Sequence, residues 1–181
     1  SVALWQLKLD SELVFVGDAG ETEASGASTR YGVEFNNHYV TNSWLMLDAD
    51  LAFSQARFDQ DQGDSPHIGR YVPGSVRTVV SMGATVSDLG PWFGQFQLRY
   101  FGPRPLIEDN SVRSTGTTLA YARLGYRLTQ DMKLSLDIFN LFNRKVSDID
   151  YYYTSRLQGE AAAGVDDIHT HPAEPRTARL T

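Results

Sequence analysis

The sequence predicts an all-β fold, an antiparallel up-and-down meander of about eight strands. Apolar and polar residues alternate with a period of two over most of the chain, and this period is typical of strands. The expected connections between strands are alternately long and short, which places the short turns at one end of the meander and the long loops at the other. No stretch keeps the three-to-four spacing of an amphipathic helix for more than one turn.

The clearest unit is residues 117–143, where two alternating arms flank the polar residues 129–131. Each arm has about ten residues, the length of a tilted strand that crosses a bilayer. The same pattern predicts the other strands, in chain order, at residues 2–16, 30–40, 45–54, 76–87 and 92–100, with an eighth strand that begins at residues 175–181 and is cut short. Long loops rich in turn-forming and polar residues are expected at residues 17–28, 59–75, 102–116 and 144–174.

The composition excludes several classes of protein. The chain of 181 residues is long enough for one domain, has no cysteine for a disulfide or a thiolate metal site, and carries a formal net charge of −6. A nucleic-acid partner held by a general basic field is therefore not expected. No apolar run approaches the roughly 18 residues that a spanning helix requires.

Each expected strand has one apolar face and one face that carries the charges. No Asp, Glu, Lys or Arg falls on the apolar parity, and charged residues occupy the other; among them are Glu34, Asp48, Asp50, Arg99, Arg123 and Asp137. In a soluble sandwich or calyx the apolar face points inward, whereas in a membrane barrel it points outward into hydrocarbon. Strands in hydrocarbon must close into a ring to satisfy their backbone groups, and eight strands can just close.

The aromatic residues favour the membrane orientation. Five of them are expected beside the short turns, where amphipathic rings meet a membrane–water interface; they are Trp5, Tyr39, Trp44, Trp92 and Tyr126. Tyr100 is expected at the opposite interface, near the long loops. Trp5 is also assigned to the apolar face of the first strand, with Leu7 and Leu9. The sequence therefore predicts a transmembrane β-barrel, of which the chain is a part or which it closes by itself.

Five segments, in order, resemble the C-terminal part of TonB-dependent outer-membrane receptors. They are residues 30–34 (RYGVE), 45–53 (LMLDADLAF), 71–77 (YVPGSVR), 137–143 (DIFNLFN) and 175–177 (PRT). The resemblance implies a large barrel in the outer membrane of a Gram-negative bacterium, plugged by an N-terminal domain and driven by an inner-membrane energy-coupling protein. Such receptors import a scarce nutrient such as an iron chelate. Because the sequence contains no plug domain and stops before a terminal aromatic residue, we expect residues 1–181 to be roughly the last third of such a receptor, its C-terminal barrel segment.

Ligand contacts are expected in the loops and the lumen, because loops carry binding residues more often than strands do. The candidates are Asp148, Asp150, Tyr151 and Tyr152 in the last long loop, and Arg99 and Arg123 on the charged face. The two arginines also suit structural pairing with aspartates on neighbouring strands. The partners implied by the resemblance are outer-membrane lipid, the plug domain, the energy-coupling protein and a small-molecule ligand that the sequence does not identify.

His169 and His171 are the weak candidates for a metal site, because an H-x-H pair near carboxylates can bind a metal. They lie in an expected loop without a third fixed ligand, so a solvated loop is the preferred interpretation and no cofactor is expected. No nucleophile–base spacing, phosphate loop or G-x-S-x-G pattern occurs, so no catalytic residue is assigned and an enzyme is not expected. The alternatives are a stand-alone small outer-membrane barrel with an adhesive or structural role, a barrel enzyme that uses the Asp/His loop, and a soluble barrel or sandwich that acts as a binding module.

Overall fold

The computed structural model describes residues 1–16 and 21–181, which contain strands and no helix. The strands are β1 (Val2–Leu9), β2 (Glu12–Val16), β3 (Glu21–Ser25), β4 (Ser28–Val40), β5 (Leu45–Gln62), β6 (Gly69–Tyr71), β7 (Thr78–Leu89), β8 (Trp92–Phe101), β9 (Thr117–Arg127), β10 (Lys133–Phe139), β11 (Ser147–Ser155), β12 (Val165–Pro172) and β13 (Thr177–Leu180). The main sheet has the order β1-β4-β5-β7-β8-β9-β10-β13, with β6 paired to β5. The antiparallel all-β meander that the sequence predicts is confirmed.

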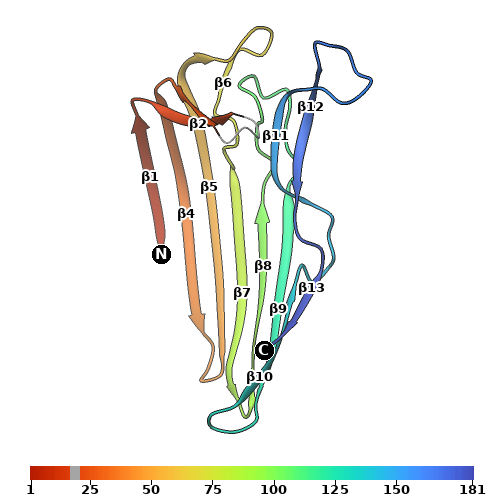
Figure 1. Cartoon of the computed structure of the whole chain (residues 1–181). Coiled ribbons are helices and arrows are strands. Elements are labelled where there is room, and N and C mark those ends of the chain that lie inside the picture. The colour runs from red at the N-terminus through yellow and green to blue at the C-terminus, as the bar shows by residue number, and fades with distance from the viewer. Residues whose placement is uncertain (17–20) are drawn as a thin grey trace.

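Figure 1 shows a tall sheet with its short turns at one end and its long loops at the other. We call these the turn end and the loop end. Two further hairpins, β2–β3 and β11–β12, belong to the loop end. Within the described residues β1 pairs only with β4, and β13 pairs only with β10. Of the two forms that the sequence allows, part of a barrel or a closed barrel, the structure therefore has the open one.

The first expected strand, residues 2–16, is wrong as a single element. β1 ends at Leu9, and β2 turns away to pair with β3. Glu12, at the start of β2, accepts hydrogen bonds from Ser28 and from Nε of Arg30 (3.0 Å), so β2 is held against the start of β4 and does not continue β1. Of the expected loop 17–28, residues 17–20 lie outside the described residues and residues 21–25 form β3.

Two other expected loops contain strands as well. β5 runs on to Gln62 and pairs with β6, inside the expected loop 59–75. The expected loop 144–174 contains the hairpin of β11 and β12. These strands carry polar or aromatic residues on both faces, so they lack the apolar alternation on which the sequence prediction depends.

The pairing register places the apolar positions of neighbouring strands on one face of the sheet. One row of this face, from β4 to β10, consists of Tyr39, Leu47, Ala84, Phe96, Ala122 and Ile138. The predicted parity is thus confirmed from β4 to β10. The apolar face is exposed, because Leu124 keeps 57%, Trp92 45% and Leu136 38% of its accessible surface. These side chains do not form the dry centre of a sandwich.

The predicted face of the first strand is wrong. Trp5 lies opposite Gly32, which is on the charged face, so Trp5, Leu7 and Leu9 do not belong to the apolar face. The ring of Trp5 lies so close to Gly32 that a Cβ there would be 2.8 Å from a ring carbon. Val2 and Leu4 continue the apolar face instead, and are 66% and 83% exposed. The alternation is ambiguous here because apolar residues occupy both parities of β1.

The largest buried apolar side chains gather at the loop end. They are Phe58 in β5, Val72 after β6, and Leu106 and Ile107 in the loop between β8 and β9. Burial of a side chain of this size contributes about 1.5–3 kcal/mol. The backbone joins the same segments, since Tyr71 N–H donates to the carbonyl of Glu108 (2.9 Å) and Gly74 N–H to that of Pro105 (2.8 Å). The loops are therefore packed against one another. No described residue lies in a helix that could cross a membrane.

Candidate functional site

On the charged face, Asp137 forms the centre of a polar cluster. Its side chain is 1% exposed and accepts hydrogen bonds from the hydroxyl of Tyr121 and from Nε of Arg123, the latter at 2.6 Å. Arg179 lies opposite Asp137 on β13. The ion pair connects β9 to β10, and Asp137 compensates the positive charge of Arg123. Arg123 therefore has the structural role of pairing with an aspartate on a neighbouring strand, one of the two roles expected for it.

Arg99 lies on the same face, on β8, with Ser81 and Leu119 as its register partners. It lines a pocket of about 250 Å³ together with Gln97, Leu119, Ala120, Tyr121, Phe139, Asn140 and Glu174. None of the ion pairs found among the described residues involves Arg99. Of the two predicted arginines, Arg99 therefore keeps the charge that is more available to an anionic ligand.

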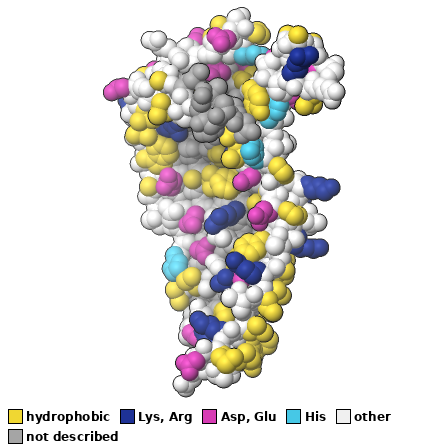
Figure 2. All heavy atoms as spheres, in the orientation of Figure 1, with side chains coloured by type: hydrophobic (Ala, Val, Ile, Leu, Met, Phe, Trp, Pro, Cys, Tyr) yellow, Lys and Arg dark blue, Asp and Glu magenta, His cyan; other side chains and the backbone are white. Residues whose placement is uncertain are grey.

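The charged face has an acidic and a basic side. Glu34, Asp48 and Asp50 lie on β4 and β5, and Arg99, Arg123, Arg127 and Lys133 lie on β8 to β10. Arg30 on β4 and Asp137 on β10 are exceptions to this division. Figure 2 shows several acidic side chains toward the left of this face, and basic side chains near its centre with further acidic ones beside them. Such a face attracts ions of opposite charge to different places, and the basic side favours an anion.

At the loop end, three of the predicted ligand residues meet in one pocket. Asp150, Tyr151 and Tyr152 line a space of about 200 Å³ with Pro73, Gly74, Arg104, Leu106 and Ile149. Asp150 is 6% exposed. Asp148 is not part of this pocket; its carbonyl accepts a hydrogen bond from Nη2 of Arg104 (3.1 Å). Arg104 thus lines the pocket and also contacts Asp148; no sequence motif marks it, so it was not among the predicted residues.

At the loop end, His67 contacts two other segments of the chain, one that contains Asp109 and one that contains Tyr152. Its Nδ1 is 3.0 Å from Oδ2 of Asp109, and its ring meets that of Tyr152 edge-on, with centroids 6.4 Å apart. Hydrogen bonds from the backbone of Ser111 and from His67 lower the pKa of Asp109 to about 2, so this carboxylate is ionised at neutral pH. Burial raises the pKa of the adjacent Glu108. The contacts of His67 fix the loop that carries it beside the pocket of Tyr152.

The two histidines that were candidates for a metal site lie in β12, so the expectation of a loop there is wrong. His169 stacks on Tyr153, with centroids 3.8 Å apart, and His171 meets Tyr151 edge-on at 6.0 Å. No group of three or more His, Cys, Asp or Glu gathers to hold a metal ion in the part of the chain that the structure describes. The imidazoles are instead packed on the tyrosines of β11.

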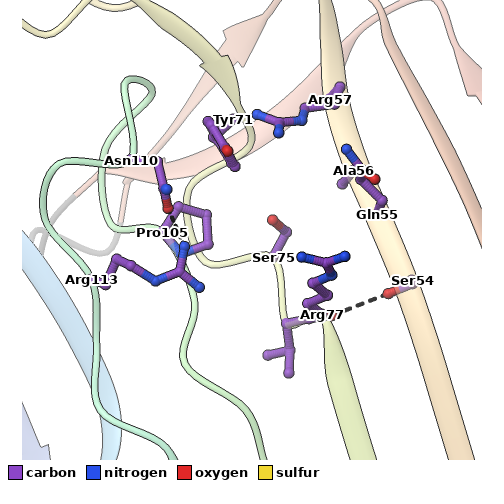
Figure 3. Close-up of a pocket in the computed structure, with 11 residues that line it drawn as sticks. Ser54, Gln55, Ala56, Arg57, Tyr71, Ser75, Arg77, Pro105, Asn110 and Arg113 are labelled. Carbon is purple, nitrogen blue, oxygen red and sulfur yellow. Dashed lines mark hydrogen bonds between the residues drawn. The ribbon is translucent and has the colours of Figure 1, made fainter.

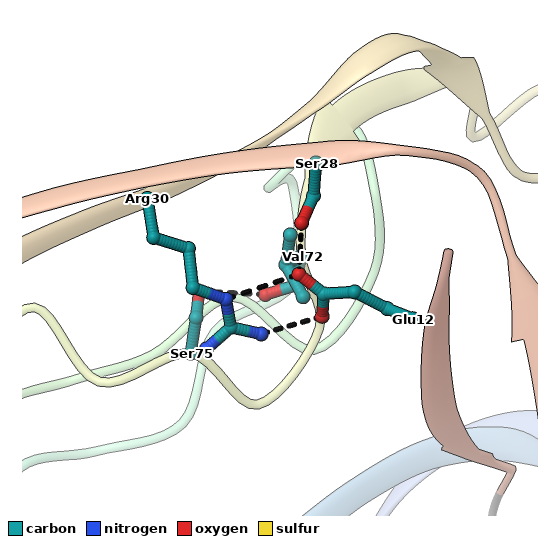
Figure 4. Close-up of polar contacts among 5 residues, drawn as sticks. All are labelled: Glu12, Ser28, Arg30, Val72 and Ser75. Carbon is teal, nitrogen blue, oxygen red and sulfur yellow. Dashed lines mark hydrogen bonds and ion pairs between the residues drawn. The ribbon is translucent and has the colours of Figure 1, made fainter. Parts of the chain in front are cut away.

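The β2–β3 hairpin is attached to the sheet by the Glu12 cluster (Figure 4). The carboxylate of Glu12 lies between Ser28 and Arg30, close to Val72 and Ser75. Burial raises the pKa of Glu12, but the hydrogen bonds from Arg30 and Ser28 outweigh it and hold this pKa below its usual value. The cluster positions the start of the hairpin beside the first residues of β4.

A basic pocket of about 320 Å³, which no sequence pattern predicts, lies at the loop end (Figure 3). Its charged residues are Arg57, Arg77 and Arg113, and Tyr71 and Asn110 also line it. No Asp or Glu is among the lining residues. We call it the arginine pocket. The three arginines come from three separate segments, so no local motif could have predicted it.

The predicted interface aromatics have mixed positions. Trp92 and Tyr126 are register partners on the apolar face near the turn end, and their rings meet edge-on at 4.8 Å. Tyr39 lies on the same face near the turn that precedes Trp44, and Tyr100 lies on this face near the loop end. Their contact with a membrane remains a prediction.

The predicted height of Trp5, by contrast, is wrong. The register places Trp5 beside Gly32 and Ser54, on the loop-end side of the apolar row that contains Tyr39, and on the charged face. Its indole Nε1 is buried and has no hydrogen-bond partner among the described residues. Trp5 is therefore not an aromatic residue of the turn end.

Comparison with known proteins places this geometry in a family. A family model described as "TonB dependent receptor-like, beta-barrel" matches residues 1–141. The chain belongs to this TonB-dependent receptor family. The match covers the strands from β1 to β10 and ends before the β11–β12 hairpin.

Similar TonB-dependent receptor chains are much longer than this one. The catecholate siderophore receptor Fiu of Escherichia coli (strain UTI89) is 24% identical over 197 residues, which cover 100% of this chain and 22% of the relative. The crystal structure of the ferric-catecholate import receptor Fiu of E. coli K12, closed form, has a TM-score of 0.70 at 18% identity, over 99% of this chain and 24% of that chain. The siderophore receptor PiuA of Acinetobacter baumannii has a TM-score of 0.71 at 14% identity, over 99% and 24%. The structural likenesses show the fold, and the chain spans less than a quarter of the length of these relatives.

Proposed function

We propose that residues 1–181 form the C-terminal part of the barrel wall in a larger outer-membrane receptor of a Gram-negative bacterium. The observation that carries the proposal is the division of the sheet into an exposed apolar face and a charged face, which fits a wall between hydrocarbon and water. The unpaired edges of β1 and β13 fit a sheet that continues into further strands, because open edges in hydrocarbon are costly.

The receptor takes up a scarce nutrient as an anionic metal chelate such as an iron chelate. Arg99 supports this proposal, because it lines a pocket on the charged face and takes part in none of the ion pairs of the described residues. The names of the relatives as catecholate siderophore receptors support the same ligand class. The protein acts by binding and transport and not as an enzyme. Its partners in the complete receptor are the surrounding lipid, the plug domain and the inner-membrane energy-coupling protein.

Loss of the Arg99 charge should weaken uptake. For the complete receptor in a strain without its own siderophore receptors, we expect Arg99→Ala to raise the apparent KM for radiolabelled ferric catecholate about tenfold. A tenfold change corresponds to about 1.4 kcal/mol, the lower range of a charge-assisted hydrogen bond. Uptake rates measured against chelate concentration give this KM.

The matched control is Lys8→Ala, which removes one positive charge from the parity of the apolar face and should leave KM unchanged. A complete receptor that takes up no anionic chelate contradicts the proposed function. Normal uptake with an unchanged KM in Arg99→Ala contradicts only the role of Arg99.

A further inference from the structure

The arginine pocket begins on the face of β5 that carries the apolar side chains. Phe53, Gln55 and Arg57 follow one another on one face of the strand, because side chains two residues apart point the same way. Phe53 belongs to the apolar face and is 47% exposed. Arg57 is four residues nearer the loop end, a rise of about 13 Å. The basic pocket therefore lies just beyond the exposed apolar band.

The residues between these two levels are amphipathic. Tyr31, which is 49% exposed, lies opposite Gln55 and donates a hydrogen bond from its hydroxyl to Oε1 of Gln55 (2.7 Å). Along this face the order is thus Phe53, then the Tyr31–Gln55 pair, then Arg57. Apolar, amphipathic and cationic groups in this order match the passage from hydrocarbon through the interface to lipid headgroups.

Two of the three arginines of the pocket are held by neighbouring groups, and none of the three is in an ion pair of the described residues. The guanidinium of Arg57 stacks on Tyr71, with Cζ 3.2 Å from the ring centroid. Arg113 is held by Oδ1 of Asn110 and by the carbonyl of Pro103, the latter at 3.0 Å. None of the ion pairs of the described residues involves Arg57, Arg77 or Arg113. Figure 3 shows the three side chains around one space between β5 and the loops.

Guanidinium groups in this state select oxyanions. The N–H donors of a guanidinium form a planar fork that fits the oxygens of a phosphate. Three positive charges that are in no ion pair favour an anionic ligand over a neutral polar one. The pocket opens beside an apolar surface, so its ligand also has a hydrophobic part that can lie along Phe53. A phosphate group joined to acyl chains has both properties.

We propose that the arginine pocket binds the phosphate of a lipid headgroup in the leaflet that surrounds the loop end. This site is separate from the one that takes the transported chelate. It rests on the membrane orientation in the proposed function, but not on transport itself. Arg57, Arg77 and Arg113 hold the phosphate, and the exposed face below them contacts the acyl chains.

Lipid binding to the purified complete receptor tests this site. Native mass spectrometry in detergent would compare phosphatidylglycerol with diacylglycerol of the same acyl chains, and with inorganic phosphate. We expect phosphatidylglycerol to bind at least about tenfold more tightly than either, because each arginine near a membrane surface contributes about fivefold. Replacement of Arg57, Arg77 and Arg113 together by Gln should remove this preference. Arg99→Gln, on the charged face, is the matched control and should keep it.

The other outcomes overturn the assignment. If the triple variant keeps its preference, the arginines do not bind the headgroup. If inorganic phosphate binds as tightly as the lipid, the pocket is a free-anion site. If ferric catecholate displaces the lipid, the pocket belongs to the transport site.

Heat-modifiable electrophoresis checks that the triple variant folds. If it does not fold, Arg77→Gln alone is the test variant, because Arg77 is exposed, and its affinity for phosphatidylglycerol should fall about fivefold. An unchanged affinity in Arg77→Gln then overturns the proposal, whereas a failed uptake assay affects only the proposed transport.

Discussion

Replacement of Asp137 by alanine should lower the free energy of unfolding of the complete receptor by about 3 kcal/mol. The carboxylate is 1% exposed and is the shared acceptor of Tyr121 and Arg123, so its loss leaves two donors without their partner. Removal of one member of a buried ion pair costs about 3–5 kcal/mol, and the partial exposure of Arg123 favours the lower value. Urea unfolding of the receptor in lipid vesicles, followed by tryptophan fluorescence, measures this difference.

The control is Asp48→Ala, because Asp48 lies on β5 and on the same charged face of the sheet as Asp137. Asp48 takes part in none of the ion pairs of the described residues, so its loss should cost less than about 1 kcal/mol. The effect of Asp137→Ala should also shrink in an Arg123→Gln background, because the two side chains form one pair. Equal losses for Asp137→Ala and Asp48→Ala would contradict the cluster.

Replacement of Leu124 by arginine should cost about 2 kcal/mol in the same unfolding measurement. Leu124 lies on the apolar face between Gly94 and Leu136 and is 57% exposed. If this face contacts hydrocarbon, the new guanidinium must be taken out of water; the cost is about 2–4 kcal/mol at the middle of a bilayer and falls toward the interface, and Leu124 lies two residues from the level of Trp92 and Tyr126. If the apolar face were instead in contact with water, as on a soluble protein, an arginine at this exposed position would be tolerated.

Asn36→Arg supplies the comparison on the opposite face. Asn36 lies opposite Asp50 on the acidic side of the charged face, so an arginine there has a neighbouring carboxylate. We expect this variant to stay within about 1 kcal/mol of the original protein. The membrane orientation is wrong if Leu124→Arg is equally mild.

The central strands could be predicted from the sequence because their environment has a period of two. From β4 to β10, each strand separates apolar from polar surroundings, so residues such as Leu98 and Gln97 alternate strictly and the face of each is fixed. The pairing of Arg123 with Asp137 was also accessible, because both lie on the charged parity of one tight hairpin.

The edge strand and the loop-end hairpins could not be predicted in the same way. β1 has apolar residues on both parities, so the sequence did not show that Trp5 belongs on the charged face. Tyrosine rings of β11 contact histidine rings of β12, one pair stacked and one edge-on, and such residues give no apolar period.

The functional candidates that the sequence missed depend on contacts between distant segments. His67 meets Asp109 and Tyr152, and the arginine pocket combines residues 57, 77 and 113, which only the packing of the loops brings together. Local spacing contains no information about such contacts. The same limit applies to Asp148, which the sequence groups with Asp150 although only Asp150 lines the pocket of Tyr152.

Site-directed spin labelling along β8 tests the orientation of the sheet most directly. Residues 1–181 contain no cysteine, so single cysteines at Gln95, Phe96, Gln97 and Leu98 can carry the label in a receptor whose other cysteines are removed. In lipid vesicles, we expect labels at Phe96 and Leu98 to collide frequently with oxygen dissolved in hydrocarbon and rarely with a water-soluble nickel chelate. Labels at Gln95 and Gln97 should show low oxygen access. The opposite alternation, or the same access at all four positions, would contradict a wall with its apolar face in the membrane.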